Sequence, residues 1–152
     1  MSESSGLASM FMEPEKSLID IPLYYKIDEN KAGVKKIRIF EDEEAKKLMD
    51  EGDKSIEVLN TKWKQASWRE QNELIEQSRR LNQHTQKVEV EWNKYRDLRI
   101  KKMLVSWDLQ YGGRPLPIVP DNIDALPDVV VFALVDKYDT AVSMDPQEKE
   151  KS

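Results

Sequence analysis

The stretch that most constrains the fold is residues 92–109, WNKYRDLRIKKMLVSWDL, the densest group of aromatic and apolar side chains in the chain. At about 100° per residue, most of these side chains fall on one broad arc of a helix, with Lys94 and Lys101 opposite on a solvated face. A turn-rich segment, QYGGRPLPIVPDN, follows directly. We therefore predict a central helix over residues 90–108. The apolar arc comprises Trp92, Tyr95, Ile100, Met103, Leu104 and Trp107.

Two arginines, Arg96 and Arg99, lie inside this apolar arc. An arginine in such a place lays its stem over apolar neighbours with the guanidinium in water, stacks on an aromatic ring, or pairs with a carboxylate. Alternatively, the two arginines and the rings beside them form a contact surface for a partner protein. Both interpretations stay open, and Arg96 and Arg99 are candidate partner-binding residues.

Length and charge bound the class of protein. A chain of 152 residues fits one domain with tails. The net charge of −5 argues against a nucleic-acid-binding protein, whose contact face is usually basic. There is no cysteine, which excludes disulfides and thiolate metal sites. The longest apolar run, residues 129–135, is too short to span a bilayer, and the N-terminus lacks the pattern of a signal peptide.

The N-terminal part predicts a tail followed by a β-hairpin. Residues 1–17 are rich in serine, glutamate and small residues, which predicts a disordered tail. Two apolar, β-branched runs follow, joined by a polar linker that ends in Gly33, and we predict a hairpin over residues 18–40. Pro22 cannot donate a ladder hydrogen bond, which predicts that the first strand is an edge strand or an extended arm.

Two helices are predicted next. Residues 42–51 begin with acidic side chains and end before Gly52, which is typical of a short helix. Residues 55–82 contain no proline or glycine, and their apolar residues recur at helical spacing, so we predict one long helix.

Trp68 and Ile75 form a second apolar spot on that predicted long helix. They are seven residues apart, on roughly the opposite face to its main apolar stripe. One interpretation is burial under the N-terminal arm or the C-terminal helix, and the other is contact with another subunit or a client protein. Trp68 and Ile75 are therefore also candidate partner-binding residues.

The C-terminal third predicts a loop, a helix and a tail. Gly112 and Gly113 indicate a turn, and three prolines keep the following chain extended. A helix is predicted over residues 127–141, although its three consecutive valines favour strand. Residues 143–152 are charged and predict a disordered tail. We expect a mainly α fold: one small helical domain over residues 18–142, with a short N-terminal β-hairpin and disordered termini.

Motifs for catalysis or cofactor binding are missing from the sequence. We find no phosphate loop, dinucleotide fingerprint, nucleophile elbow or metal-ligand cluster. His84 is the only histidine and has no ligand set or nucleophile partner near it in sequence. We therefore predict no catalytic residues, no cofactor, no bound metal and no nucleic-acid or membrane partner.

The order of motifs in residues 92–138 resembles a known family. A predicted helix ends in SWDL, the loop GGRPLP follows, and IDALP precedes a last apolar helix with LVDKY. This order resembles the C-terminal half of the tail assembly chaperones of long-tailed, siphovirus-like bacteriophages. Upstream, WKQASWREQNEL and EVEWNKYRDLRIKKML are similar to the N-terminal half of those proteins. The resemblance covers about residues 34–140 and does not extend to the first 30 residues.

The resemblance implies a non-enzymatic assembly factor in the cytoplasm of an infected bacterium. Such a chaperone binds the tape measure protein, a long and largely helical chain, and keeps it soluble until tail tube subunits polymerise around it. It is absent from the finished virion. Partners would be the tape measure protein and the tail tube protein, with self-association as a further option. The alternatives are a structural virion protein, such as a tail or head–tail connector subunit, and a small enzyme.

Overall fold

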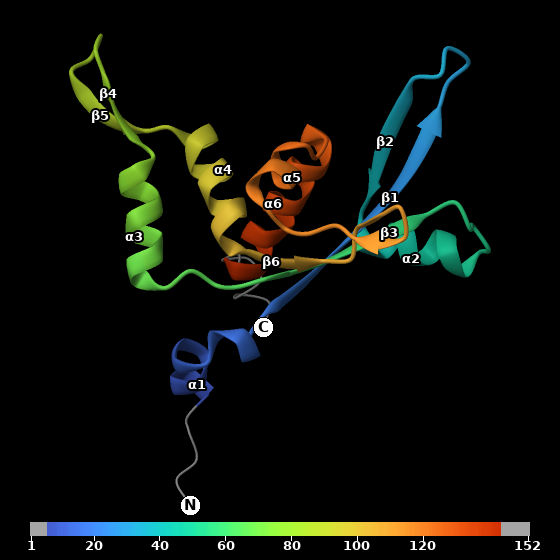
Figure 1. Ribbon diagram of the computed structural model, residues 1–152, viewed down its shortest axis with the longest axis horizontal. Helices are drawn as coiled ribbons and strands as arrows, with labels where there is room; N and C mark the ends of the chain where they lie inside the picture. Colours follow the sequence, from blue (N-terminus) through green and yellow to red (C-terminus); the bar gives the residue numbers. More distant parts are fainter. Residues whose placement is uncertain (1–5, 144–152) are drawn as a thin grey trace, which may run out of the picture. The chain divides into compact units, whose positions relative to one another are not determined.

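The computed structural model describes residues 6–143, and its fold is mixed α/β (Figure 1). Of these described residues, 44% lie in helices and 29% in strands, and four of the strands form an antiparallel sheet. The prediction of a mainly α fold is therefore wrong.

The chain divides into two compact units, where the sequence predicts one domain over residues 18–142. Unit 1 comprises Met1–Ile19 and Trp63–Val105, and unit 2 comprises Asp20–Lys62 and Ser106–Ser152.

The four-stranded sheet has the strand order β2-β1-β3-β6, and most of it belongs to unit 2. The boundary between the units falls within β6 and at one end residue each of β1 and β3. Unit 2 also contains α2, α5 and α6. The elements are β1 (Ile19–Glu29), β2 (Lys35–Phe40), α2 (Asp42–Asp50), β3 (Glu57–Trp63), β6 (Leu104–Trp107), β7 (Gln110–Tyr111), β8 (Arg114–Pro115), α5 (Pro120–Asp124) and α6 (Asp128–Val142).

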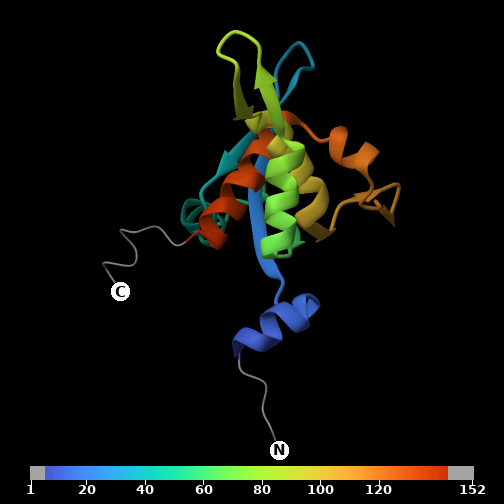
Figure 2. The same ribbon diagram turned by 90° about the vertical axis from the view of Figure 1, so that its left-hand side faces the viewer.

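The N-terminal hairpin is present, but its first strand is not an edge strand. β1 pairs antiparallel with β2 from Tyr24↔Phe40 to Glu29↔Lys35, and β3 lies on its other side. Pro22 precedes the stretch paired with β2, so its missing N–H costs no hydrogen bond in that ladder. The prediction of an edge strand or an extended arm is therefore wrong, because β1 lies between two strands. The hairpin turn stands clear of the rest of unit 2 (Figures 1 and 2).

The predicted long helix over residues 55–82 is wrong in its first half, which forms β3. Burial alternates along this strand, with Leu59, Thr61 and Trp63 inside. Thr61 is polar, so it interrupts the apolar alternation that would have indicated a strand. Its hydroxyl donates to the carbonyl of Ile21 at 2.7 Å, which satisfies it inside the sheet. The second half of the prediction becomes a helix, α3 (Trp68–Gln77), and the start of a hairpin.

Unit 1 is built on two helices joined by a hairpin. α3 leads into β4 (Arg79–Asn82) and β5 (Lys87–Val90), which pair antiparallel, and α4 (Trp92–Met103) follows. In both views α3 and α4 lie side by side, with the hairpin between their connected ends (Figures 1 and 2). Ile100 and Met103 are buried on α4, but Trp92 is 63% exposed.

The predicted central helix over residues 90–108 is too long, because α4 ends at Met103 and β6 begins at Leu104. Hydrogen bonding to β3 explains the change. Asp108 donates its N–H to the carbonyl of Asn60, and its carboxylate accepts from the Asn60 N–H and Nδ2. Trp107 is half-buried, and its Nε1–H donates to the carbonyl of Leu116 at 2.6 Å.

The ends of the described chain are helical. The helix predicted over residues 127–141 is present as α6, whose inner face buries Val130, Leu134, Val135 and Tyr138. At the other end, where a disordered tail is predicted over residues 1–17, the chain forms α1 (Gly6–Met12) and a 3-10 turn, η1 (Pro14–Lys16). No residue of α1 is buried. Residues 1–5 and all but the first of the predicted tail at 143–152 lie outside the described residues.

Candidate partner-binding surface

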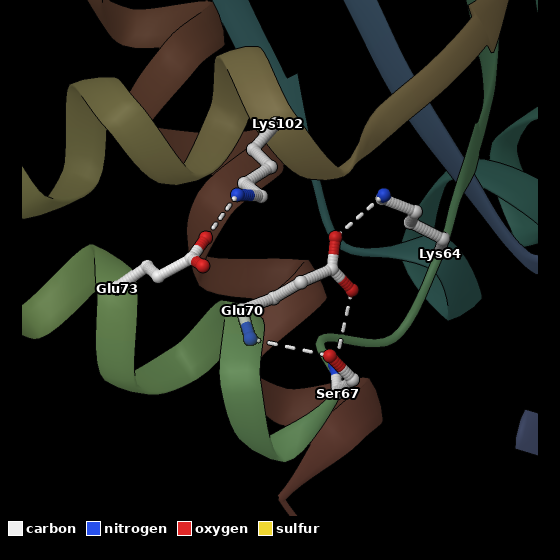
Figure 3. Close-up of polar contacts among 5 residues, drawn as sticks. All are labelled: Lys64, Ser67, Glu70, Glu73 and Lys102. Carbon is white, nitrogen blue, oxygen red and sulfur yellow. Dashed lines mark hydrogen bonds and ion pairs between the residues drawn. The ribbon is translucent and has the colours of Figure 1, made fainter.

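A capping box fixes the start of α3. The Ser67 hydroxyl accepts from the N–H of Glu70 at 3.2 Å, and the Glu70 carboxylate accepts from the N–H of Ser67 at 3.1 Å (Figure 3). These bonds satisfy two N–H groups that no helical carbonyl can reach, which places Trp68 as the first residue of the helix. The Ser-x-x-Glu pattern is a sequence signal for this start, and the predicted helix over residues 55–82 passes over it.

Glu70 also anchors the segment that leads into α3. Its second oxygen accepts from Lys64 Nζ at 2.7 Å (Figure 3). Burial raises the pKa of Glu70, but the hydrogen bonds from Lys64 and Ser67 favour the charged form more strongly, so the pKa lies below its ordinary value. At neutral pH the carboxylate is therefore ionised and holds both partners.

Polar and apolar contacts fasten α3 to α4. Leu74 is buried, and Gln71 Nε2 donates to the Tyr95 hydroxyl at 2.7 Å. Lys102 Nζ donates to Glu73 at 3.2 Å (Figure 3). Because the inner face of α3 is held in this way, its outer face has a defined orientation in unit 1.

Trp68 is the first residue of α3 and is 85% exposed. It borders a shallow hollow of about 440 Å³ that it shares with Arg69, Asn72, Glu73 and Glu76. The burial interpretation is therefore wrong for Trp68. Ile75 is half-buried and does not line the hollow, so the structure does not join the two residues into one apolar spot. Of the pair, only Trp68 offers a large free apolar surface.

Arg96 and Arg99 are engaged within α4. The Arg99 guanidinium lies 5.6 Å from the centroid of the Tyr95 ring, and Trp92 meets the same ring edge-on at 5.5 Å. Arg96 Nη1 donates to Asn93 Oδ1 at 3.2 Å. For Arg99 the geometry favours stacking on an aromatic ring over a free contact surface. Neither arginine lines the hollow beside Trp68.

A second concave surface lies in unit 2, and the sequence analysis missed it. We call it the α6 groove, and it is partly open with a volume of about 950 Å³. It is formed by the start of β1, the end of β2 with the start of α2, and one side of α6. The lining residues are Asp20, Ile21, Pro22, Ile39, Phe40, Glu41, Asp42, Glu43, Ala133, Asp136, Lys137, Thr140 and Ala141.

No sequence motif indicates this groove, because its lining comes from three segments about 20 to 90 residues apart in the chain that only the fold brings together.

Within residues 6–143, no group of three His, Asp or Glu side chains is arranged to hold a metal ion. Over the same described range, the helices are too short or too polar to cross a membrane. Both surfaces combine apolar side chains with charged or polar ones.

Comparison with known protein families, curated proteins and solved structures finds no match to this chain.

Proposed function

We propose that this chain is a non-enzymatic tail assembly chaperone of a long-tailed bacteriophage. In this proposal it binds the tape measure protein in the cytoplasm of the infected host, keeps it soluble while the tail assembles, and is absent from the mature virion. The motif order in residues 34–140 supports the family. The observation that carries the proposal is the exposure of Trp68 on a helix whose position is otherwise fixed.

An exposed tryptophan of this kind suits a chaperone for a helical client. Tryptophan offers a large, rigid apolar area at low entropic cost, and it is enriched among the residues that dominate binding energy. Around Trp68 the hollow is bordered by charged and polar side chains, which resembles the polar rim of an interface. An amphipathic client helix laid along α3 would cover Trp68 with its apolar face.

A structural virion protein is the second candidate, and α1 is the observation that favours it. Four large apolar residues of α1 are exposed, and none of its residues is buried. A short apolar helix of this kind gains stability by docking on a neighbouring subunit of an assembly. The exposed residues are Leu7, Met10, Phe11 and Met12.

The test is co-expression of the tagged full chain with the tape measure protein of the same phage, followed by pull-down. Trp68→Ala is expected to lower capture at least tenfold, about 1.4 kcal/mol or more, while the free energy of unfolding changes by less than about 0.5 kcal/mol. Trp92→Ala is the matched control, because Trp92 is also exposed but lies on α4 outside the hollow.

Retained capture by Trp68→Ala would show that α3 is not the contact surface. If the unaltered chain captures no tape measure protein, the chaperone proposal itself fails. If both tryptophan variants lose capture equally, the client binds through non-specific contacts with exposed aromatic residues, and α3 is not a specific contact surface.

A further inference from the structure

Apolar side chains form part of the wall on each side of the α6 groove. Pro22 and Ile39 are only half-buried and come from neighbouring strands of the sheet. Facing them, α6 contributes the small side chains of Ala133 and Ala141, which allow another chain to approach the helix closely. The groove therefore has apolar area to cover and the space to admit side chains.

The charges along the groove are almost all negative. Five carboxylates line it against a single lysine, Lys137. That lysine is already engaged, because its Nζ donates to the carbonyl of Pro22 and to Asp42 and lies 5.8 Å from the centroid of the Tyr24 ring. The five carboxylates are those of Asp20, Glu41, Asp42, Glu43 and Asp136.

Within the described part of the chain, three of these carboxylates form no ion pair. Among residues 6–143, Asp20 pairs with Lys62 at 3.5 Å and Asp42 pairs with Lys137. Glu41, Glu43 and Asp136 are exposed and form no ion pair within the same described range. The described residues therefore leave negative potential in the groove that a cationic partner could neutralise.

Stabilisation of α2 explains only part of this arrangement. Glu43 lies in the first turn of α2, where negative charge interacts favourably with the helix dipole. Asp136 lies in the middle of α6, where the dipole gives it no advantage, and it faces the same groove from the opposite wall. Negative charge on both walls points to a cationic occupant.

We propose that the α6 groove binds a basic, amphipathic segment of the client protein, in which lysine or arginine side chains flank a few apolar ones. The inference rests on the proposed chaperone function and adds a second attachment site to it, in unit 2. The apolar residues of the segment would cover Pro22 and Ile39, and its cations would meet Glu43 and Asp136. The same negative charges repel nucleic acid and anionic lipid surfaces.

The test uses synthetic peptides, so that it does not depend on the tape measure protein. The full chain is titrated with a labelled helical peptide of about 15 residues whose lysines flank leucines, and with a twin carrying glutamates in place of the lysines. The basic peptide is expected to bind and the acidic twin not to bind. Binding should weaken when the salt concentration is raised to about 0.5 M, because exposed charge pairs are screened.

Charge reversal locates the site. The double variant Glu43→Lys with Asp136→Lys is expected to weaken binding of the basic peptide about tenfold at low salt. Glu44→Lys is the matched control, because Glu44 lies in the same first turn of α2 but does not line the groove. Ala141→Phe fills the groove without changing charge and should weaken binding as well. Each variant is first shown by thermal melting to remain folded.

The outcomes separate this site from the proposed function. Equal weakening by Glu44→Lys, or equal binding of both peptides, would overturn the groove proposal, because attraction would then be general. A change of oligomeric state in the double variant would assign the groove to a second copy of this chain and overturn the client assignment. If the basic peptide fails to bind while the unaltered chain still captures the tape measure protein, the groove proposal falls and the chaperone proposal stands. If the basic peptide binds at the groove but the unaltered chain does not capture the tape measure protein, the groove is a site for a basic segment and the chaperone proposal falls.

Discussion

At the scale of single residues, Glu70 links three parts of unit 1. Its carboxylate accepts hydrogen bonds from the backbone of Ser67 and from Lys64, while its own N–H completes the capping box. Because its pKa is lowered in the folded state, this carboxylate contributes stability above its unfolded pKa, near 4.5. That contribution is lost as the pH falls through the lower folded pKa.

Glu70→Gln tests this contribution, because glutamine keeps the capping acceptor but loses the charge facing Lys64. We expect the variant to be less stable than the unaltered chain by about 0.5–1 kcal/mol at neutral pH, since both side chains are partly exposed and solvent screens the pair. The difference should shrink as the pH is lowered from 7 through the lowered folded-state pKa of Glu70, because the carboxyl group itself then becomes neutral. Urea unfolding across this pH range measures it.

Glu76→Gln on the same helix is the control. Glu76 pairs with Arg79, but its side chain is 71% exposed, so little change in the free energy of unfolding is expected at any pH. A loss for Glu70→Gln that stays as large once the Glu70 carboxyl is protonated as it is at pH 7 would mean that packing of the side chain, and not its charge, matters.

At the scale of elements, helices are predicted correctly where no buried polar residue interrupts the spacing of the apolar residues. α2 and α6 lie close to their predicted bounds, because their apolar spacing and their start signals agree. β3 was missed because Ile56, Leu59 and Trp63 also fit a helical stripe, while Thr61 conceals the alternation. The stability of β3 comes from neighbours distant in sequence, such as Ile21, which local periodicity does not reveal.

Thr61→Lys discriminates between the two secondary structures. In the predicted helix, residue 61 would lie opposite the apolar stripe and a lysine there would be tolerated. In β3, residue 61 is 2% exposed, so the lysine would be buried without a partner. We expect a loss of at least about 3 kcal/mol in the free energy of unfolding.

Thermal melting followed by circular dichroism measures this loss. Lys62→Thr places the same two residue types on the exposed side of β3, and it should shift the melting temperature by a few degrees at most. Equal tolerance of both substitutions would contradict the strand.

At the scale of the whole molecule, only part of the candidate site could be predicted from the sequence. Trp68 was a candidate from its position outside the apolar stripe, and it is exposed. Ile75 was a candidate on the same reasoning, yet it is half-buried. Arg96 and Arg99 were candidates because they lie inside an apolar arc, yet both are held by neighbours within α4. The α6 groove could not be foreseen, because Asp20, the acidic run at residues 41–43 and Asp136 are far apart in the chain, and only the fold brings them to one groove.

The fate of the whole chain separates the two candidate functions. A chaperone releases its client when the tail tube polymerises, so we expect the chain in infected cells but not in purified virions. Quantitative mass spectrometry of both samples measures this, with a tail tube subunit as the internal standard for copy number. A virion protein would instead be retained at a fixed ratio to that standard, with α1 docked on a neighbouring subunit.

Stoichiometric retention would therefore reject the chaperone proposal, and deletion of residues 1–12 should then prevent incorporation. If the chain is absent from virions, the same deletion should leave capture of the tape measure protein unchanged, because Trp68 and the α6 groove lie outside the deleted residues.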